Sequence, residues 1–110
     1  MTTTTATQAT FAADVREFLE QRKAQEEFET TLDVVRTCFP ELVGIEAFMQ
    51  ADPDIDDRWR VIVEVKLPRS HPPSVLLDQR RRFAERIVAR LPPAQVPDTV
   101  CSLSISFAQD

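Results

Sequence analysis

The chain has 110 residues, of which 43% are hydrophobic and 28% charged, and its formal net charge is −5 at pH 7. This length predicts one domain with one core, and the composition excludes disorder throughout the chain. No apolar run approaches the roughly 18 residues that a membrane span needs, and residues 1–10 lack the basic and apolar segments of a signal peptide, so a cytoplasmic location is expected.

The N-terminal region divides into a tail and a helical segment. Residues 1–9 are Thr-rich and carry little to bury, which predicts a disordered tail before a single domain at residues 10–110. Thr10 is suited to cap a helix, and Pro40 ends the helical pattern. The second half of this segment has apolar side chains at helical spacing, namely Phe28, Leu32, Val35 and Phe39.

An earlier apolar stripe, the N-terminal stripe, is the most function-like signal in the sequence. It consists of Phe11, Val15, Phe18 and Leu19. The polar stretch 20–27 separates it from the next apolar residues, so either one long helix projects its first half or two shorter helices meet near Lys23. A projecting half would need a partner to cover the stripe, for instance a second copy of the chain. The alternative is that the stripe folds back on its own sheet.

The middle and end of the chain read as three strands and one helix. Residues 42–50 and 59–67 alternate apolar and polar positions, which favours two antiparallel strands joined by an acidic loop. Residues 74–91 have a broad apolar helical face. It is formed by Leu76, Phe83, Ile87 and Leu91, with support from Leu77, Ala84 and Val88. Residues 101–107 alternate apolar side chains with serines and predict the third strand.

These elements predict an α+β fold with the order α-β-β-α-β, built as a two-layer sandwich. A right-handed crossover from the second strand places the third strand beside the first, giving a three-stranded antiparallel sheet in the order 2-1-3. The helices then cover one face. The exposed strand edges and the serine-lined open face offer a second route to self-association.

Charge is distributed unevenly along the chain. Residues 1–57 carry 4 basic and 13 acidic side chains, whereas residues 58–90 carry 9 basic and 3 acidic ones. Three arginines follow at i, i+4 spacing on the second helix, with a fourth just before it, which predicts a possible polyanion-binding ridge. These residues are Arg69, Arg82, Arg86 and Arg90. The absence of an aromatic platform and the net negative charge count against RNA binding.

The acidic loop is the best candidate for metal chemistry. Its carboxylates are Asp52, Asp54, Asp56 and Asp57. An EF-hand loop would need glycine where Asp57 stands and glutamate where Val63 stands. A metal-dependent phosphoryl-transfer site would need a glycine-rich phosphate cradle, and the chain has one glycine. A solvated hairpin loop is therefore the preferred interpretation, with no metal and no cofactor.

The sequence offers little else for catalysis. His71 is the only histidine and has no cysteine or acid at ligand spacing, so a surface linker residue is expected. Cys38 and Cys101 lie on apolar stripes and are interpreted as buried, reduced thiols, with a disulfide between them as the alternative. The serines of the last strand have no neighbouring base. We therefore expect no catalytic residue.

In element order and length, the chain resembles small bacterial α+β proteins, some of which act as accessory or antitoxin-like partners. The sequence favours a non-enzymatic protein–protein interaction or dimerisation module that binds itself or another protein through the N-terminal stripe. One alternative is RNA or polyanion binding through the arginine-rich helix. The other is a weak divalent-metal-dependent phosphoryl-transfer enzyme at the acidic loop. No small-molecule substrate is indicated.

Overall fold

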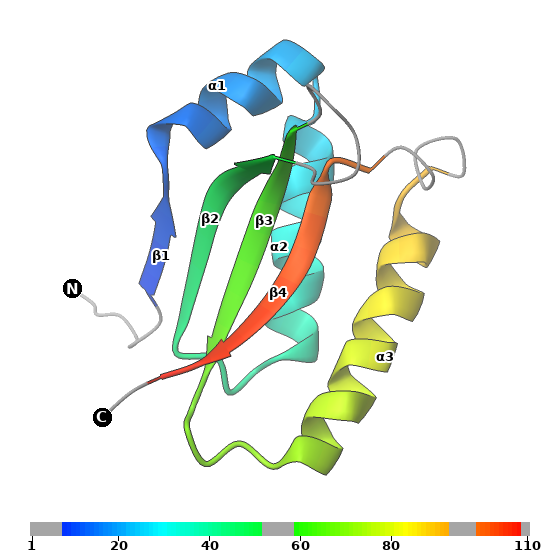
Figure 1. Cartoon of the computed structure of the whole chain (residues 1–110). Helices are drawn as coiled ribbons and strands as arrows, with labels where there is room; N and C mark the ends of the chain where they lie inside the picture. Colours follow the sequence, from blue (N-terminus) through cyan, green and yellow to red (C-terminus); the bar gives the residue numbers. More distant parts are fainter. Residues whose placement is uncertain (1–7, 52–58, 93–98, 109–110) are drawn as a thin grey trace, which may run out of the picture.

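The computed structural model describes residues 8–51, 59–92 and 99–108, which form one sheet with helices packed against it (Figure 1). The strands are β1 (Gln8–Phe11), β2 (Gly44–Ala51), β3 (Trp59–Leu67) and β4 (Cys101–Phe107). The helices are α1 (Ala13–Arg22), α2 (Gln25–Cys38) and α3 (Pro73–Arg90). The expected α+β class is confirmed.

The sheet is mixed and has the strand order β1-β2-β3-β4. β1 pairs with β2 in parallel, β2 pairs with β3 antiparallel, and β3 pairs with β4 in parallel. In the shared register, Ala47 on β2 lies opposite Val63 on β3, which lies opposite Leu103 on β4. One face of this sheet carries the core.

The predicted three-stranded antiparallel sheet is therefore wrong in its strand number and in its order. It placed residues 101–107 beside residues 42–50, but that edge of β2 is occupied by β1. Only the outer edge of β3 is left for β4, and a crossover through α3 delivers β4 to that edge in parallel orientation. The β2–β3 hairpin was predicted correctly.

The start of the chain also differs from the prediction. Thr10 was expected to cap the first helix and residues 1–9 to form a tail, but Gln8–Phe11 is strand β1, and α1 begins at Ala13. Residues 1–7 lie outside the described part. The second predicted helix, residues 74–91, is confirmed to within one residue at each end by α3, with Pro73 in its first turn.

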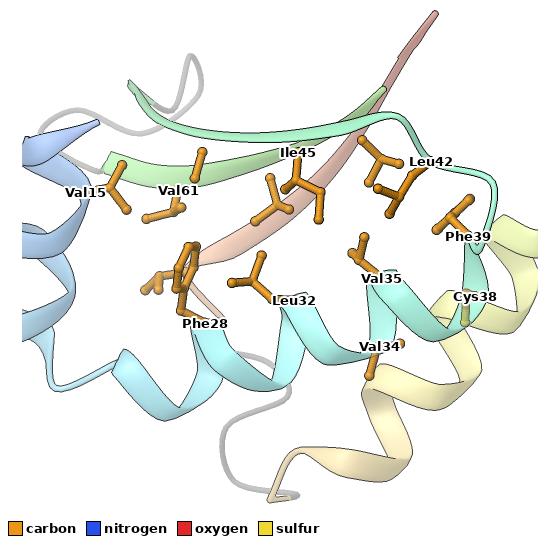
Figure 2. Packing of buried hydrophobic residues seen from close by; sticks show 14 of the residues in the cluster. Val15, Phe28, Leu32, Val34, Val35, Cys38, Phe39, Leu42, Ile45 and Val61 are labelled. Atoms are coloured by element: carbon orange, nitrogen blue, oxygen red, sulfur yellow. The ribbon is translucent and has the colours of Figure 1, made fainter. Parts of the chain in front are cut away.

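The core lies between the sheet and α2 (Figure 2). Four inward residues of β3 are completely buried, each with 0% of its surface exposed, and they are Val61, Val63, Val65 and Leu67. α2 presents Phe28, Leu32 and Val35 to them, while Val34 points away from the sheet, toward α3 (Figure 2). The alternation of β3 and the helical spacing of α2 thus meet in one apolar layer.

The two-helix alternative for residues 10–39 is confirmed, with the break at Lys23. Lys23 has φ 54° and ψ 43°, in the left-handed region. Its N–H bonds to the carbonyl of Glu20, and the N–H of Ala24 bonds to that of Leu19. These two bonds and the burial of both Ala24 and Leu19 form a Schellman motif, with lysine in the position that usually holds glycine.

Candidate interaction surface

Strand β4 forms an edge of the sheet, and its backbone is only partly paired. Val61 N–H donates to Val100 O at 2.8 Å, and Ala108 N–H donates to Leu67 O at 2.8 Å. Even-numbered residues of β4 therefore bond to β3, because a parallel ladder uses alternate residues. The N–H and C=O groups of Leu103, Ile105 and Phe107 point the other way and have no partner within the described ranges.

The first outward group of β4 is an exception. The N–H of Cys101 donates to Oε2 of Glu27 at 2.9 Å, and the N–H of Val100 donates to the same oxygen at 2.9 Å. Glu27 lies on α2 and is buried. The unpaired part of the edge therefore begins after Cys101, at Leu103.

The side chains of β4 are poorly covered for a strand that faces the core. Leu103 and Ile105 pack against the core but are only half-buried, and Phe107 is 45% exposed. β4 contains no proline and no charged residue, the devices that usually protect an exposed edge from pairing with another chain. This edge is therefore open to a further strand.

Helix α3 leaves an apolar stripe uncovered on the same side of the molecule. Leu77 is 69% exposed and Val88 is 55% exposed, and Ala84 between them is also exposed. At 3.6 residues per turn these three positions fall within about 40° of arc. We call Leu77, Ala84 and Val88 the α3 stripe.

The α3 stripe points away from α2. Gln79 bonds to Glu41, which follows α2, and Arg86 lines a hollow shared with α2. Both residues are roughly opposite Leu77 on the helix. Figure 1 shows α2 behind the middle of the sheet and α3 on the side of β4. The stripe and the unpaired edge therefore face the same way, and together they form the β4–α3 face.

On the open face of the sheet, side chains of neighbouring strands pair with one another. Phe48 lies opposite Ile62, and both are half-buried. Arg60 Nε donates to Ser102 Oγ at 2.8 Å. Ser106 differs, because its Oγ is shielded from water and has no hydrogen-bond partner among the described residues. This unpaired hydroxyl lies on β4, next to the free edge.

The N-terminal stripe packs mainly on the chain itself. Val15 is 0% exposed and Leu19 is 3% exposed, both in the core. The Phe11 ring meets the Phe28 ring edge to face at 5.3 Å. Phe18 is partly exposed beneath the Arg22 guanidinium, whose carbon is 5.5 Å from the ring centre. The alternative in which this stripe folds back on its own sheet is the observed arrangement.

A hollow of about 320 Å³ opens between α1 and α2, beside the N-terminal stripe. Its lining combines the apolar side chains of Phe11, Leu19 and Phe28 with the charged side chains of Arg16, Glu20 and Glu29, among others. The apolar part belongs to the protein core. The charged part carries mixed signs and favours no single class of ligand.

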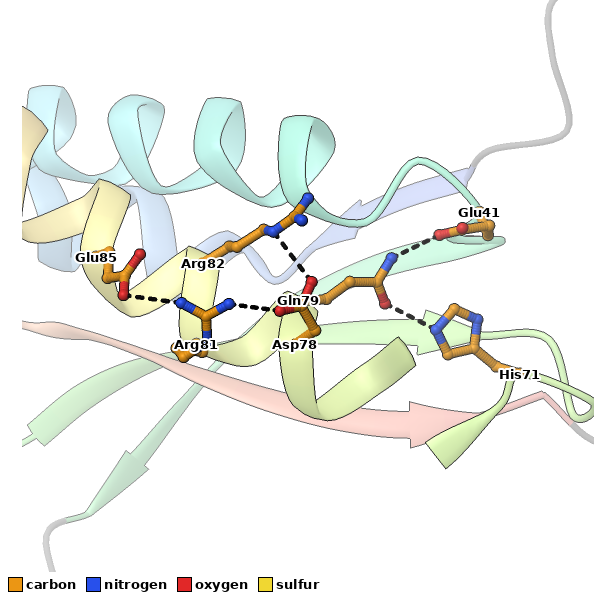
Figure 3. Close-up of polar contacts among 7 residues, drawn as sticks. All are labelled: Glu41, His71, Asp78, Gln79, Arg81, Arg82 and Glu85. Carbon is orange, nitrogen blue, oxygen red and sulfur yellow. Dashed lines mark hydrogen bonds and ion pairs between the residues drawn. The ribbon is translucent and has the colours of Figure 1, made fainter. Parts of the chain in front are cut away.

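The predicted arginine ridge is partly neutralised by acids. Arg82 pairs with Asp78 at 3.0 Å on α3 (Figure 3). Arg90 pairs with Asp33 of α2 at 2.9 Å. Arg86 lies along the same flank, beside α2. Arg69 is exposed in the connection between β3 and α3. The ridge exists as a helix flank, but two of its three guanidinia already have carboxylate partners.

A polar network that the sequence did not indicate joins α3 to the loop before β2. His71 was expected to be a surface residue, which is wrong, since it is only 8% exposed. Its Nε2 lies 2.7 Å from Oε1 of Gln79, whose Nε2 donates to Glu41 at 2.9 Å (Figure 3). The hydrogen bond from Gln79 lowers the pKa of the Glu41 carboxyl, and nearby His71 contributes less. Gln79 is the one buried residue of α3.

Both cysteines are free thiols. Burial raises the pKa of Cys38, with partial compensation from Arg86 and Arg82. Burial also raises the pKa of Cys101, and the neighbouring Glu27 carboxylate adds to the shift. Neutral thiols are weak nucleophiles, so neither environment activates its sulfur.

The acidic loop with Asp52, Asp54, Asp56 and Asp57 lies outside the described residues. Elsewhere, in the described ranges, no three His, Cys, Asp or Glu side chains are grouped to hold a metal ion. Within the same ranges, no helix combines the length and the apolar character required to cross a membrane. No protein-family model, curated protein or solved structure matches the chain.

Proposed function

We propose that the chain is a non-enzymatic protein–protein interaction module that binds its partner at the β4–α3 face. The observation that carries this proposal is the coincidence of two incomplete surfaces. The outward backbone groups from Leu103 to Phe107 have no partner among the described residues, and the α3 stripe beside them exposes large apolar side chains. A partner that adds a strand to β4 would form hydrogen bonds with these backbone groups and would contact the α3 stripe.

The sequence placed the partner surface on the N-terminal stripe. We propose the β4–α3 face instead, because Val15 and Leu19 are already buried in the core of the chain. Fully burying a leucine or valine side chain stabilises a complex by roughly 1.5–3 kcal/mol. Leu77 and Val88 still have most of that gain available, whereas Val15 and Leu19 have none.

Photo-crosslinking of the full chain in its native host tests the proposal. A photoreactive residue in place of Leu77 or Val88 should give covalent adducts with an identified protein. The same residue in place of Val75 serves as the control, because Val75 is 39% exposed on the same helix but lies about 200° around it from Leu77. Equal adducts from Val75, or none from Leu77 and Val88, would contradict the proposal.

A second arm uses charge to block the face. The double variant Leu77→Glu with Val88→Glu places two carboxylates on the α3 stripe, where they lose hydration if a partner covers them. We expect crosslinks from a probe at Ala84 to disappear in this background. Because both side chains are mostly exposed, folding should be nearly unchanged, and circular dichroism with urea unfolding checks this.

A further inference from the structure

We infer that the partner at the β4–α3 face is a second copy of this chain, with β4 pairing antiparallel to β4 of that copy around a two-fold axis at Ile105. The inference rests on the proposed function and names its partner. Two four-stranded sheets would then become one continuous sheet. All α2 and α3 helices would remain on the same face, because the two-fold axis is perpendicular to the sheet.

The pattern of β4 favours a second copy as the occupant. From residue 103 to residue 107 the chain reads Leu-Ser-Ile-Ser-Phe. Apolar residues and serines alternate in the same order whether this segment is read forwards or backwards. An antiparallel copy therefore sets apolar side chains against apolar ones on the core face and serines against serines on the open face. An unrelated strand would have to reproduce this pattern, whereas a second copy carries it already.

The register follows from the part of the edge whose backbone has no partner in the described ranges. Glu27 occupies the N–H of Cys101, so pairing can use the outward groups from Leu103 to Phe107. The midpoint of that segment is Ile105. In an antiparallel pair, residues whose backbones face each other exchange both hydrogen bonds. Ile105 then lies opposite itself, and Leu103 lies opposite Phe107 of the second copy.

This register covers the side chains of the edge that are partly exposed in a single copy. Phe107, 45% exposed, would lie over the half-buried Leu103 of the other copy. On the open face, Ser104 would lie opposite Ser106, whose Oγ has no partner within the described part of the chain. A serine pair across two strands supplies a hydroxyl to that oxygen.

The α3 helices complete the contact. The same two-fold axis makes the two copies of α3 antiparallel, and the α3 stripe of each faces the other. Leu77 of one copy then approaches Val88 of the other. Beside the stripe, Arg81 and Glu85 form an ion pair at 3.2 Å within one chain. Reversal of the second helix places the arginine of one copy level with the glutamate of the other, so like charges do not oppose each other.

Cysteine pairs test the partner and the register together. Ser104→Cys and Ser106→Cys, made in separate chains with tags of different size, are mixed and oxidised. The proposed register brings these two positions directly opposite each other, at a Cα separation near 4.5 Å that a disulfide can bridge. We expect a mixed covalent dimer. Each variant alone should give little dimer, since residue 104 would lie two positions away from its own copy.

Other outcomes overturn the inference. A covalent dimer from Ser104→Cys alone means an axis at residue 104, and one from Ser106→Cys alone means an axis at residue 106. The unmodified chain, with Cys38 and Cys101, should give no covalent dimer. Serine to cysteine is a small change at half-buried positions, so circular dichroism of each variant should match the unmodified chain.

Light scattering gives an independent readout that needs no new cysteine. The unmodified chain should have twice the mass of one chain, and Leu77→Glu with Val88→Glu should reduce it to one. Val75→Glu should leave the mass doubled. A chain that stays monomeric at high micromolar concentration overturns the inference of a second copy. The proposed function fails separately, if the in-cell crosslinks from Leu77 and Val88 find no protein at all.

Discussion

Glu27 on α2 accepts a hydrogen bond from the N–H of Cys101 on β4 at 2.9 Å, across 74 positions of sequence. The same carboxylate oxygen accepts the N–H of Val100 at 2.9 Å. Glu27 therefore ties the start of the edge strand to the central helix. It also defines which outward backbone groups of β4 lack a partner among the described residues, because these groups begin only after this contact.

Removing this carboxylate should destabilise the fold. Glu27→Ala leaves the N–H of Val100 and the N–H of Cys101 unsatisfied in a largely buried place, and we expect a loss of about 2–4 kcal/mol in the free energy of unfolding. Glu27→Gln retains an acceptor oxygen and should lose about half as much. Urea unfolding of both variants measures the difference. A neutral Glu27→Ala would show that water replaces the carboxylate without cost.

At Lys23, in contrast, we predict a substitution that raises the free energy of unfolding. Its left-handed backbone costs a residue with a Cβ atom about 1–2 kcal/mol, whereas glycine adopts it freely. After subtraction of the larger entropy of glycine in the unfolded chain, Lys23→Gly should stabilise the fold by about 0.5–1 kcal/mol. Arg22→Gly is the matched control inside α1, and it should destabilise by a similar amount. Thermal unfolding of the pair tests both signs.

The strands and helices with clear periodicity could be predicted from the sequence. β3 alternates over its whole length, and α3 has a sharp start at Pro73, so both were placed correctly. β1 was missed because four residues are too few to show alternation. Its absence from the prediction then misplaced β4, since the free edge of β2 seemed open. Strand order depends on such distant pairings, which local patterns do not encode.

The candidate surface was less predictable than the fold. Leu77, Ala84 and Val88 were assigned to the core, because apolar residues at helical spacing look alike whether or not a sheet lies beneath them. The sheet ends at β4, so no described strand covers the outer part of this broad face. The width of the apolar face on α3 was the available signal. Conversely, the sequence pattern did not show what buries Val15 and Leu19, because it did not indicate β1 and left open whether the helix breaks near Lys23.

Acid should weaken the network around Gln79. The pKa of Glu41 is lowered in the folded chain, first by the hydrogen bond from Gln79. A lowered pKa means that this carboxylate stabilises the fold above its unfolded value, 4.5, and that the contribution disappears as pH falls through the folded value. Because Glu41 is largely exposed, the effect should stay below about 1 kcal/mol.

Glu41→Gln isolates this contribution, since the amide keeps an acceptor but does not titrate. The unmodified chain should be more stable than Glu41→Gln near neutral pH, and the two should converge as the pH falls through the lowered pKa of Glu41 in the folded chain. Urea unfolding across that range measures the gap. A gap that is constant with pH would mean that the charge of Glu41 contributes nothing and that Gln79 bonds equally well to a neutral group.

The N-terminal stripe allows a direct test of whether it belongs to the core or to a partner. Leu19 is 3% exposed, so Leu19→Ala should lower the free energy of unfolding by about 2–5 kcal/mol. Phe18→Ala, at a partly exposed ring, should cost clearly less. If the stripe served a partner instead, Leu19→Ala would reduce the mass seen by light scattering while leaving the unfolding of the monomer unchanged. We expect the reverse, because the contacts of Leu19 lie within its own chain.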